Sequence, residues 1–146
     1  MPDQTVVAAP KADEAAAARA AGLRRDLTSF SDKLMKDIRD LPIVDKEKFE
    51  LSLKVVDVQN NFVAAPDDGA REAQLGELRK IWGEVMLKRA EIIAGKLGKI
   101  KLEFPDRFMG QVRERLAGIA EDGYREEDMK DFEAYLADGE KLAGTR

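Results

Sequence analysis

The chain of 146 residues contains no histidine and no cysteine. Histidine is the side chain that titrates near neutral pH and the most common metal ligand, and cysteine is the best intrinsic nucleophile. Their absence leaves carboxylate, amine and hydroxyl chemistry, and it excludes disulfides and the usual zinc sites. It sets no compartment, since a chain without thiols is compatible with reducing and with oxidising surroundings.

Long hydrophobic runs and phosphate-binding loops are also missing. No stretch reaches 18 consecutive apolar residues, which argues against a transmembrane helix. Neither Gly-x-x-x-x-Gly-Lys-Ser/Thr nor Gly-x-Gly-x-x-Gly occurs. The N-terminus lacks the basic and apolar segments of a secretory signal, which favours the cytoplasm, although a processed exported chain would look the same.

Aromatic side chains make up only 6% of the chain. Catalysis by carboxylates alone, as in glycoside hydrolysis, needs two carboxyl groups beside a sugar-binding cleft, and aromatic groups normally line such clefts. Here most of the few aromatic residues fall at predicted core positions. We therefore predict that the protein is not an enzyme and that it holds no cofactor and no metal.

Charged residues are abundant, at 37% of the chain, and their signs are unevenly distributed. Residues 105–146 carry seven basic and eleven acidic side chains, a difference that equals the whole net charge of -4. The acidic residues are densest from Glu121 to Glu140, a region that would repel nucleic acid and attract a basic partner. A solvated helix face is the simpler interpretation. The candidate contact residues of this region are Glu126, Glu127, Asp128 and Asp131.

The first part of the chain predicts a flexible tail followed by a long helix. Residues 1–12 have no apolar period, so we expect a tail there and a single helical domain over 13–146. An alanine-rich run and an apolar stripe then predict a helix that Pro42 ends. The stripe consists of Leu23, Leu27, Phe30, Leu34, Ile38 and Leu41.

The second segment, 45–65, is ambiguous. Its apolar residues form two rows at helical spacing, Phe49, Leu53, Val56 and Val63 on one side and Leu51, Val55, Val58 and Phe62 on the other. A helix that is apolar on two sides is normally central, and Asp45 is suited to cap it. Residues 48–55 and 99–104 also alternate with the period of strands, so an α+β fold with a small two-stranded element there is the alternative. We favour the helix because the alternation fails after Val55.

A turn at residues 66–69 precedes a predicted third helix over 70–97. Small residues recur in this helix at heptad spacing, at Gly69, Gly76, Gly83 and Ala90. Interior glycine costs a helix about 1 kcal/mol relative to alanine, so the repeat indicates close approach of another backbone. That backbone belongs either to a neighbouring helix or to a second copy. Gly76, Gly83 and Ala90 are therefore candidate interaction residues.

Two further helices complete the expected domain. One begins at Pro105 and ends at Gly123, and the last covers about 125–143. Their predicted buried residues are Phe108, Met109, Val112, Leu116 and Ile119, followed by Met129, Phe132, Leu136 and Leu142.

Together these patterns predict an all-α, antiparallel bundle of four to five helices. We expect a non-catalytic protein-protein interaction or assembly module, adaptor-like or chaperone-like, that recognises a protein partner or a second copy through its helix faces. A basic partner would bind the region from Glu121 to Glu140, and nucleic acid is disfavoured. The alternative function is a small-molecule or lipid-binding bundle with an apolar cavity near Trp82, where Arg89 would pair with an anionic head group.

Overall fold

The computed structural model describes the backbone of residues 2–99 and 104–144, and the side chains within these ranges from residue 14 onward, Phe104 excepted. Over this part of the chain the structure consists of five helices without strands. They are α1 (Pro2–Asp40), α2 (Asp45–Ala64), α3 (Asp68–Leu97), α4 (Phe104–Glu121) and α5 (Glu126–Ala143). The predicted all-α fold is confirmed.

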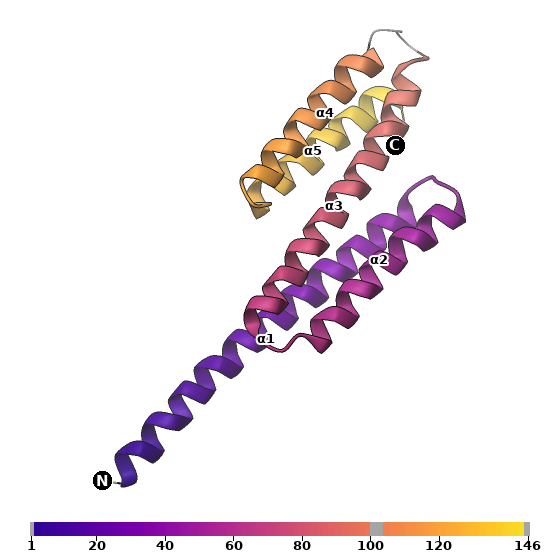
Figure 1. Ribbon diagram of the computed structural model, residues 1–146. Coiled ribbons are helices and arrows are strands. Elements are labelled where there is room, and N and C mark those ends of the chain that lie inside the picture. Colours follow the sequence, from indigo (N-terminus) through magenta and orange to yellow (C-terminus); the bar gives the residue numbers. More distant parts are fainter. Residues whose placement is uncertain (1, 100–103, 145–146) are drawn as a thin grey trace.

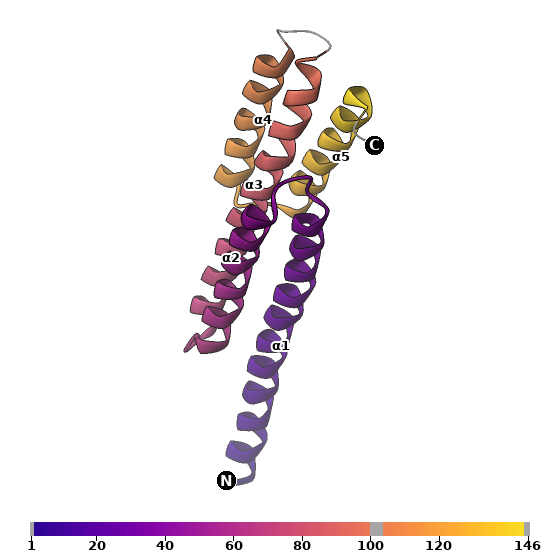
Figure 2. The same ribbon diagram turned by 90° about the vertical axis from the view of Figure 1, so that its right-hand side faces the viewer.

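α3 is the central helix, and it contacts each of the other four (Figure 1). The hairpin of α1 and α2 packs toward the N-terminal end of α3, and the hairpin of α4 and α5 packs toward its C-terminal end (Figure 2). Each hairpin therefore buries its apolar side against a different part of the same helix.

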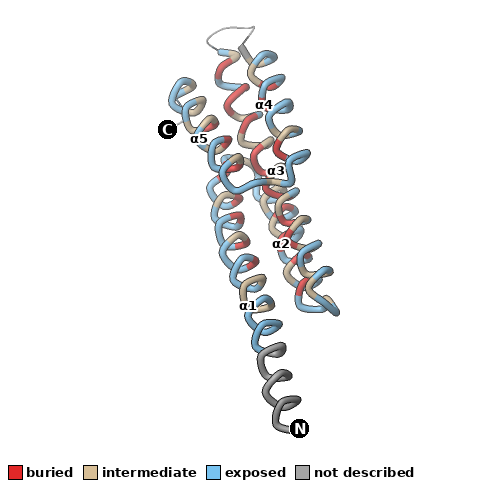
Figure 3. The backbone as a smooth tube through the Cα atoms, turned by 90° about the vertical axis from the view of Figure 1, so that its left-hand side faces the viewer, coloured by how far each residue is buried: buried red, intermediate tan, exposed pale blue. Residues whose placement is uncertain are grey.

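The hydrophobic core follows α3 along its length. The buried residues of this helix are Leu75, Leu78, Ile81, Trp82, Val85, Met86, Ala90, Ile93, Ala94 and Leu97. Fully buried side chains from the other helices complete the core, among them Leu34, Ile38, Val55, Val112 and Leu136. The prediction that Leu142 is buried is wrong, since this side chain is exposed in the last turn of α5. Figure 3 shows that the buried positions run along the inner sides of the helices, with exposed positions on the outer sides. A chain of this size can bury enough surface to fold without disulfides or a metal.

α1 is longer than the sequence predicts. The helix begins at Pro2, although residues 1–12 were expected to form a flexible tail, and its N-terminal part projects beyond the bundle (Figure 1). Ala8, Ala9 and the alanine-rich run that follows favour a helix because alanine has the highest helix propensity, whereas Pro10, inside the helix, opposes it. The predicted apolar stripe is confirmed, since Leu27, Leu34, Ile38 and Leu41 are buried and Leu23 and Phe30 pack partly buried against them.

α2 settles the ambiguity of the second segment. Residues 48–55 are helical, so the two-stranded alternative is wrong for this half, and its proposed partner at 99–104 lies largely outside the described residues. The helical spacing of the buried residues Leu51, Val55, Val58 and Phe62 explains the outcome. Val44 occupies the N-cap position without a side-chain hydrogen bond, which corrects the expected cap at Asp45.

The predicted turns are formed by the expected residues. The Asp67 carboxylate accepts a hydrogen bond of 2.8 Å from the Ala70 backbone N–H at the start of α3, as an N-cap does. Gly123 follows α4 with a φ of +85°, a conformation that glycine adopts without steric cost. These two positions lie in the connections from α2 to α3 and from α4 to α5.

Candidate functional site: an exposed apolar face on α2

The most unusual surface of the described structure lies on the outer side of α2. Four of the seven large hydrophobic side chains that are exposed belong to this one helix, which therefore carries a concentrated apolar surface. The exposed fractions are 63% for Phe49, 44% for Leu53, 39% for Val56 and 83% for Val63. We call these four side chains the α2 face. Single exposed apolar residues are ordinary on protein surfaces, but a contiguous group marks a contact surface.

The α2 face has the spacing of a helix-packing surface. From Phe49 to Val63 the successive intervals are four, three, four and three residues, with Asn60 as the polar member of the row. This is the a/d spacing by which helices pack side by side, and one asparagine in such a row helps to define the register of pairing. The second apolar row of α2 thus has helical geometry but no covering helix within the described bundle.

This arrangement corrects one expectation from the sequence. An apolar surface on both sides of segment 45–65 predicted a central helix, but the central helix is α3. Only the row from Leu51 to Phe62 faces the core, while the row from Phe49 to Val63 faces outward. The sequence shows two apolar rows at helical spacing, but the spacing does not show that only one of them faces the core.

A charged groove borders the α2 face on the side of α3. It has a volume of about 350 Å³, and it is lined by Glu47, Glu50, Leu51, Lys54, Glu84, Leu87, Lys88 and Glu91. Both lysines are engaged across the groove, Lys54 with Glu84 at 2.8 Å and Lys88 with Glu47 at 3.9 Å. These contacts replace the pair within α3 that helical spacing suggests for Glu84 and Lys88. Two acidic side chains of the lining, Glu50 and Glu91, form no ion pair within the described structure.

The small-residue row of α3 is not a site of close backbone approach. Apart from the nearby backbone of α3 itself, a Cβ atom added at Gly76 or Gly83 would have no atom of the described residues within 4 Å. Both glycines are half-buried, whereas Ala90 is fully buried in the core. The structure therefore does not bring Gly76, Gly83 and Ala90 together as one exposed surface, and a contact with a second copy at the two glycines stays a prediction.

Gly83→Ala is expected to raise the free energy of unfolding by about 0.5 to 1 kcal/mol. The new methyl group meets open space, and alanine restricts the unfolded chain and favours the helix. Urea denaturation followed by circular dichroism measures the change. Gly123→Ala is the matched control, and it should destabilise the protein because the φ of +85° is strained for alanine. A less stable Gly83→Ala protein would contradict the open environment of this glycine.

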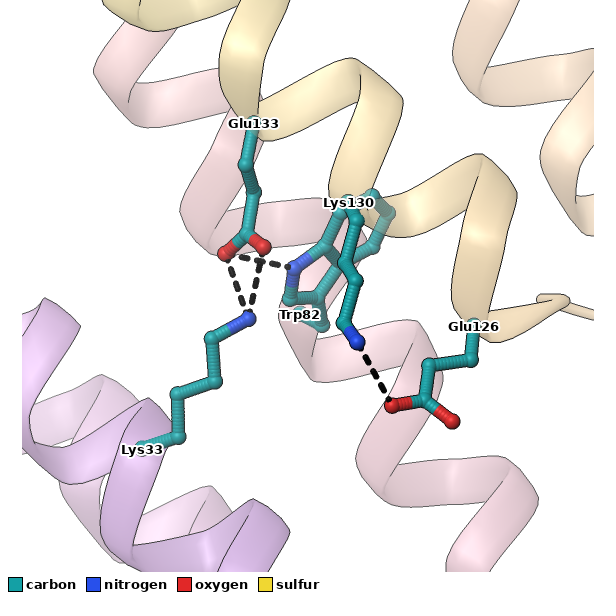
Figure 4. Close-up of polar contacts among 5 residues, drawn as sticks. All are labelled: Lys33, Trp82, Glu126, Lys130 and Glu133. Atoms are coloured by element: carbon teal, nitrogen blue, oxygen red, sulfur yellow. Dashed lines mark hydrogen bonds and ion pairs between the residues drawn. The ribbon is translucent and has the colours of Figure 1, made fainter.

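Trp82 lies inside the bundle beside a polar contact between helices. Its indole ring is fully buried and meets the Phe132 ring edge to face, with 5.8 Å between the ring centroids. The indole Nε1–H points to Glu133 Oε1 at 3.5 Å, and Lys33 Nζ donates to both carboxylate oxygens of Glu133 at 2.6 Å (Figure 4). Arg89 pairs with Glu140. Side chains from α1, α3 and α5 thus meet in a cluster of ion pairs in which Glu133, Arg89 and Glu140 are partly buried and Lys33 is exposed.

These contacts bear on the alternative of a ligand cavity near Trp82. A pocket of about 370 Å³ opens between α1, α3 and the start of α5. Its lining includes Phe30, Leu75 and Met129, but neither Trp82 nor Arg89 is among the lining residues. The expected pairing of Arg89 with an anionic head group is opposed by its ion pair with Glu140. The small-molecule alternative therefore gains no support at the residues that suggested it.

The acidic region from Glu121 to Glu140 divides between the surface and the helix interfaces. Glu133 and Glu140 face inward and pair with bases of other helices. On the surface, Glu126 pairs with Lys130 at 3.1 Å (Figure 4). The remaining candidates are exposed at Glu127 and Asp131 and partly exposed at Asp128. Binding of a basic partner here stays a prediction, with fewer free acids than the sequence suggests.

Asp37→Asn is expected to raise the free energy of unfolding at pH 7. Asp37 is half-buried on α1, and its Oδ2 atom accepts no hydrogen bond from any described residue. Burial and then the charge of Glu133 raise the pKa of the Asp37 carboxyl above its ordinary 3.8, although Lys33 and Arg89 act in the opposite direction. The folded chain therefore binds this proton more tightly than the unfolded chain. The ionised carboxylate costs stability at neutral pH, and the cost is relieved as the pH falls through the raised pKa toward 3.8.

Urea denaturation at pH 7 and near pH 4 tests this assignment. The advantage of Asp37→Asn over the wild type should shrink as the pH falls, because the wild-type carboxyl becomes protonated. The control is Asp32→Asn, which changes an exposed carboxylate on the same helix. A variant that is less stable than the wild type at pH 7 would show that the carboxylate has a favourable partner.

The described residues offer no sign of a metal site or of a membrane span. Within the described ranges, no group of three or more acidic side chains lies close enough together to hold a metal ion. None of the described helices combines the length and apolar composition needed to cross a bilayer. No protein-family model, curated protein or solved structure matches the chain.

Proposed function

We propose that this protein is a non-catalytic interaction module that binds a partner helix through the α2 face. The observation that supports the proposal is the row of four exposed apolar side chains at helix-packing spacing on a single helix. Recognition of this type lays the apolar side of a partner helix along such a row, with anchors three and four residues apart. Complete burial of each side chain would contribute on the order of 1 to 3 kcal/mol.

The bundle supports this role by presenting the α2 face on a rigid helix. The opposite side of α2 is held in the core by Leu51, Val55, Val58 and Phe62, so the outward row need not change conformation to bind. A preorganised surface loses little conformational entropy on association. The same argument favours the α2 face over the α3 glycines, since Gly76 and Gly83 offer no side chain to a partner.

The absence of cysteine makes a site-specific test straightforward. A single cysteine at position 56, introduced as Val56→Cys and labelled with an environment-sensitive fluorophore, reports directly on the α2 face. The probe is a synthetic amphipathic helix with leucine at its a and d positions and glutamine elsewhere on its polar surface. We expect a saturable fluorescence change at position 56 and at least a tenfold loss of affinity on Leu53→Asp.

Glu127→Cys, labelled in the same way, is the control because Glu127 is exposed on α5, in the other hairpin. The label at position 127 should not respond to the peptide. An unchanged signal at position 56 up to millimolar peptide would contradict the proposed function, and so would an equal response at both labels.

A further inference from the structure

We infer that the partner of the α2 face is an amphipathic helix with basic residues along the edge that faces α3. The inference rests on the proposed function and specifies the chemistry of the partner. It is carried by the charges that border the α2 face, since the apolar row alone would accept any apolar helix.

Three of the acidic side chains beside the α2 face have no ion-pair partner within the described structure. Glu50 and Glu91 line the groove between α2 and α3, and Asp57 lies two helical turns beyond Glu50 on the same side of α2. None of the three forms an ion pair with another described residue. A basic side chain that reached this groove would therefore meet free carboxylates.

The basic residues of the same surface do not cancel this charge. Lys54 and Lys88 are already paired with Glu84 and Glu47, and Lys48 donates a hydrogen bond of 2.6 Å to the Arg39 backbone carbonyl. Lys46 is exposed and forms no ion pair with a described residue, and it lies four residues before Glu50 on the same edge. The three unpaired acids therefore exceed the one unpaired base.

The opposite edge of the α2 face has no net charge. It carries Asp45, Lys48, Ser52 and Gln59, which lie on the side of the row away from Glu50 and Asp57. The surface is thus polarised across its width, with unpaired carboxylates in excess on the edge toward α3 and balanced charge on the other edge. A complementary helix would carry its bases along one edge only.

A second copy of this chain is a poorer occupant of the α2 face. In that copy the α2 face is bordered by the same three unpaired acids and by the single unpaired base Lys46, so the copy brings excess negative charge toward Glu50 and Asp57. Pairing of two such surfaces in antiparallel orientation would oppose the acidic edges, and like charges across an interface disfavour association. A partner with a basic edge satisfies the same apolar row and also the free carboxylates.

Three synthetic peptides that differ only along one edge test the inference with the full-length protein labelled at position 56. Their a and d positions are leucine, and the edge residues are lysine, glutamine or glutamate. At low salt we expect the lysine peptide to bind at least tenfold more tightly than the glutamate peptide, with the glutamine peptide between them. At 1 M salt the three affinities should converge, because exposed charges are then screened.

Charge reversal locates the effect. The double variant Glu50→Lys with Glu91→Lys should reverse the preference between the lysine and glutamate peptides. The matched control, Glu121→Lys with Glu127→Lys, makes the same change in net charge on exposed residues of the other hairpin, and it should retain the wild-type preference.

The outcomes separate this inference from the proposed function. Equal binding of all three peptides at low salt would contradict the inferred basic edge of the partner, but it would still support the α2 face as a binding surface. Failure of all three peptides to bind would overturn both. Sedimentation equilibrium of the wild type and of Leu53→Asp tests for a dimer. A wild-type dimer that Leu53→Asp dissociates would show that a second copy binds the α2 face, and it would contradict a partner with a basic edge.

Discussion

Replacing Trp82 with alanine is expected to lower the free energy of unfolding by about 3 to 5 kcal/mol. Among the described residues, Trp82 has the largest fully buried side chain. It lies on the central helix beside Glu133, whose ion pair with Lys33 links the two hairpins. Its removal leaves a cavity beside Phe132 and takes the indole N–H away from Glu133. Domains of this size are stable by only about 5 to 15 kcal/mol, so the loss would be a large part of the total.

The measurement is urea denaturation followed by far-ultraviolet circular dichroism, since the variant has no tryptophan fluorescence. Trp82→Phe keeps an aromatic ring and should lose clearly less stability than Trp82→Ala. Phe49→Ala is the exposed aromatic control, and we expect a change within about 0.5 kcal/mol. A loss below about 1 kcal/mol in Trp82→Ala would contradict the central position of this residue.

The second large effect is expected from one change made on the two sides of α2. Leu51→Asp should lower the free energy of unfolding by about 4 kcal/mol or more, because it places an unpaired carboxylate in the core. Leu53→Asp introduces the same residue two positions later on the α2 face, and it should cost less than about 1 kcal/mol. Leu51 is buried, whereas Leu53 is exposed.

Thermal unfolding and helix content by circular dichroism distinguish the two variants. The comparison is matched in residue type and in helix, so a difference in stability reports only the side of α2 that faces the core. Equal destabilisation by both substitutions would mean that α2 is covered on both sides in solution, as in a stable homodimer. That outcome would indicate that a second copy of the chain covers the α2 face.

The proposed function of α2 follows from its position at the edge of the bundle. Because α3 provides the common packing surface for both hairpins, α2 lies at the edge of the bundle and needs only one apolar side for folding. Its second apolar side therefore stays available for a partner. Polar contacts between helices have a different role, since they link α1, α3 and α5. These contacts are made by Lys33, Trp82, Arg89, Glu133 and Glu140.

The local structure of this protein was predictable from its sequence. The apolar stripe of α1, the turn capped by Asp67 and the glycine end of α4 at Gly123 follow from side-chain spacing and backbone preferences that act over a few residues. The same local rules placed most of the core, including Trp82, Val112 and Phe132, because apolar residues at helical spacing must be removed from water on at least one side of each helix.

Only the tertiary structure decided which helix is central and which surfaces remain exposed. In α2 the rows of Leu51 and Leu53 are both apolar and both helical, so periodicity defines two sides and cannot tell which one meets another helix. Sequence could likewise not show that the glycines of α3 lack a close neighbour or that Glu133 and Glu140 face the other helices. A residue's neighbours on other helices depend on how the helices pack. Long-range packing therefore determined the candidate site, because local sequence defines the sides of a helix and the assembly of the bundle chooses among them.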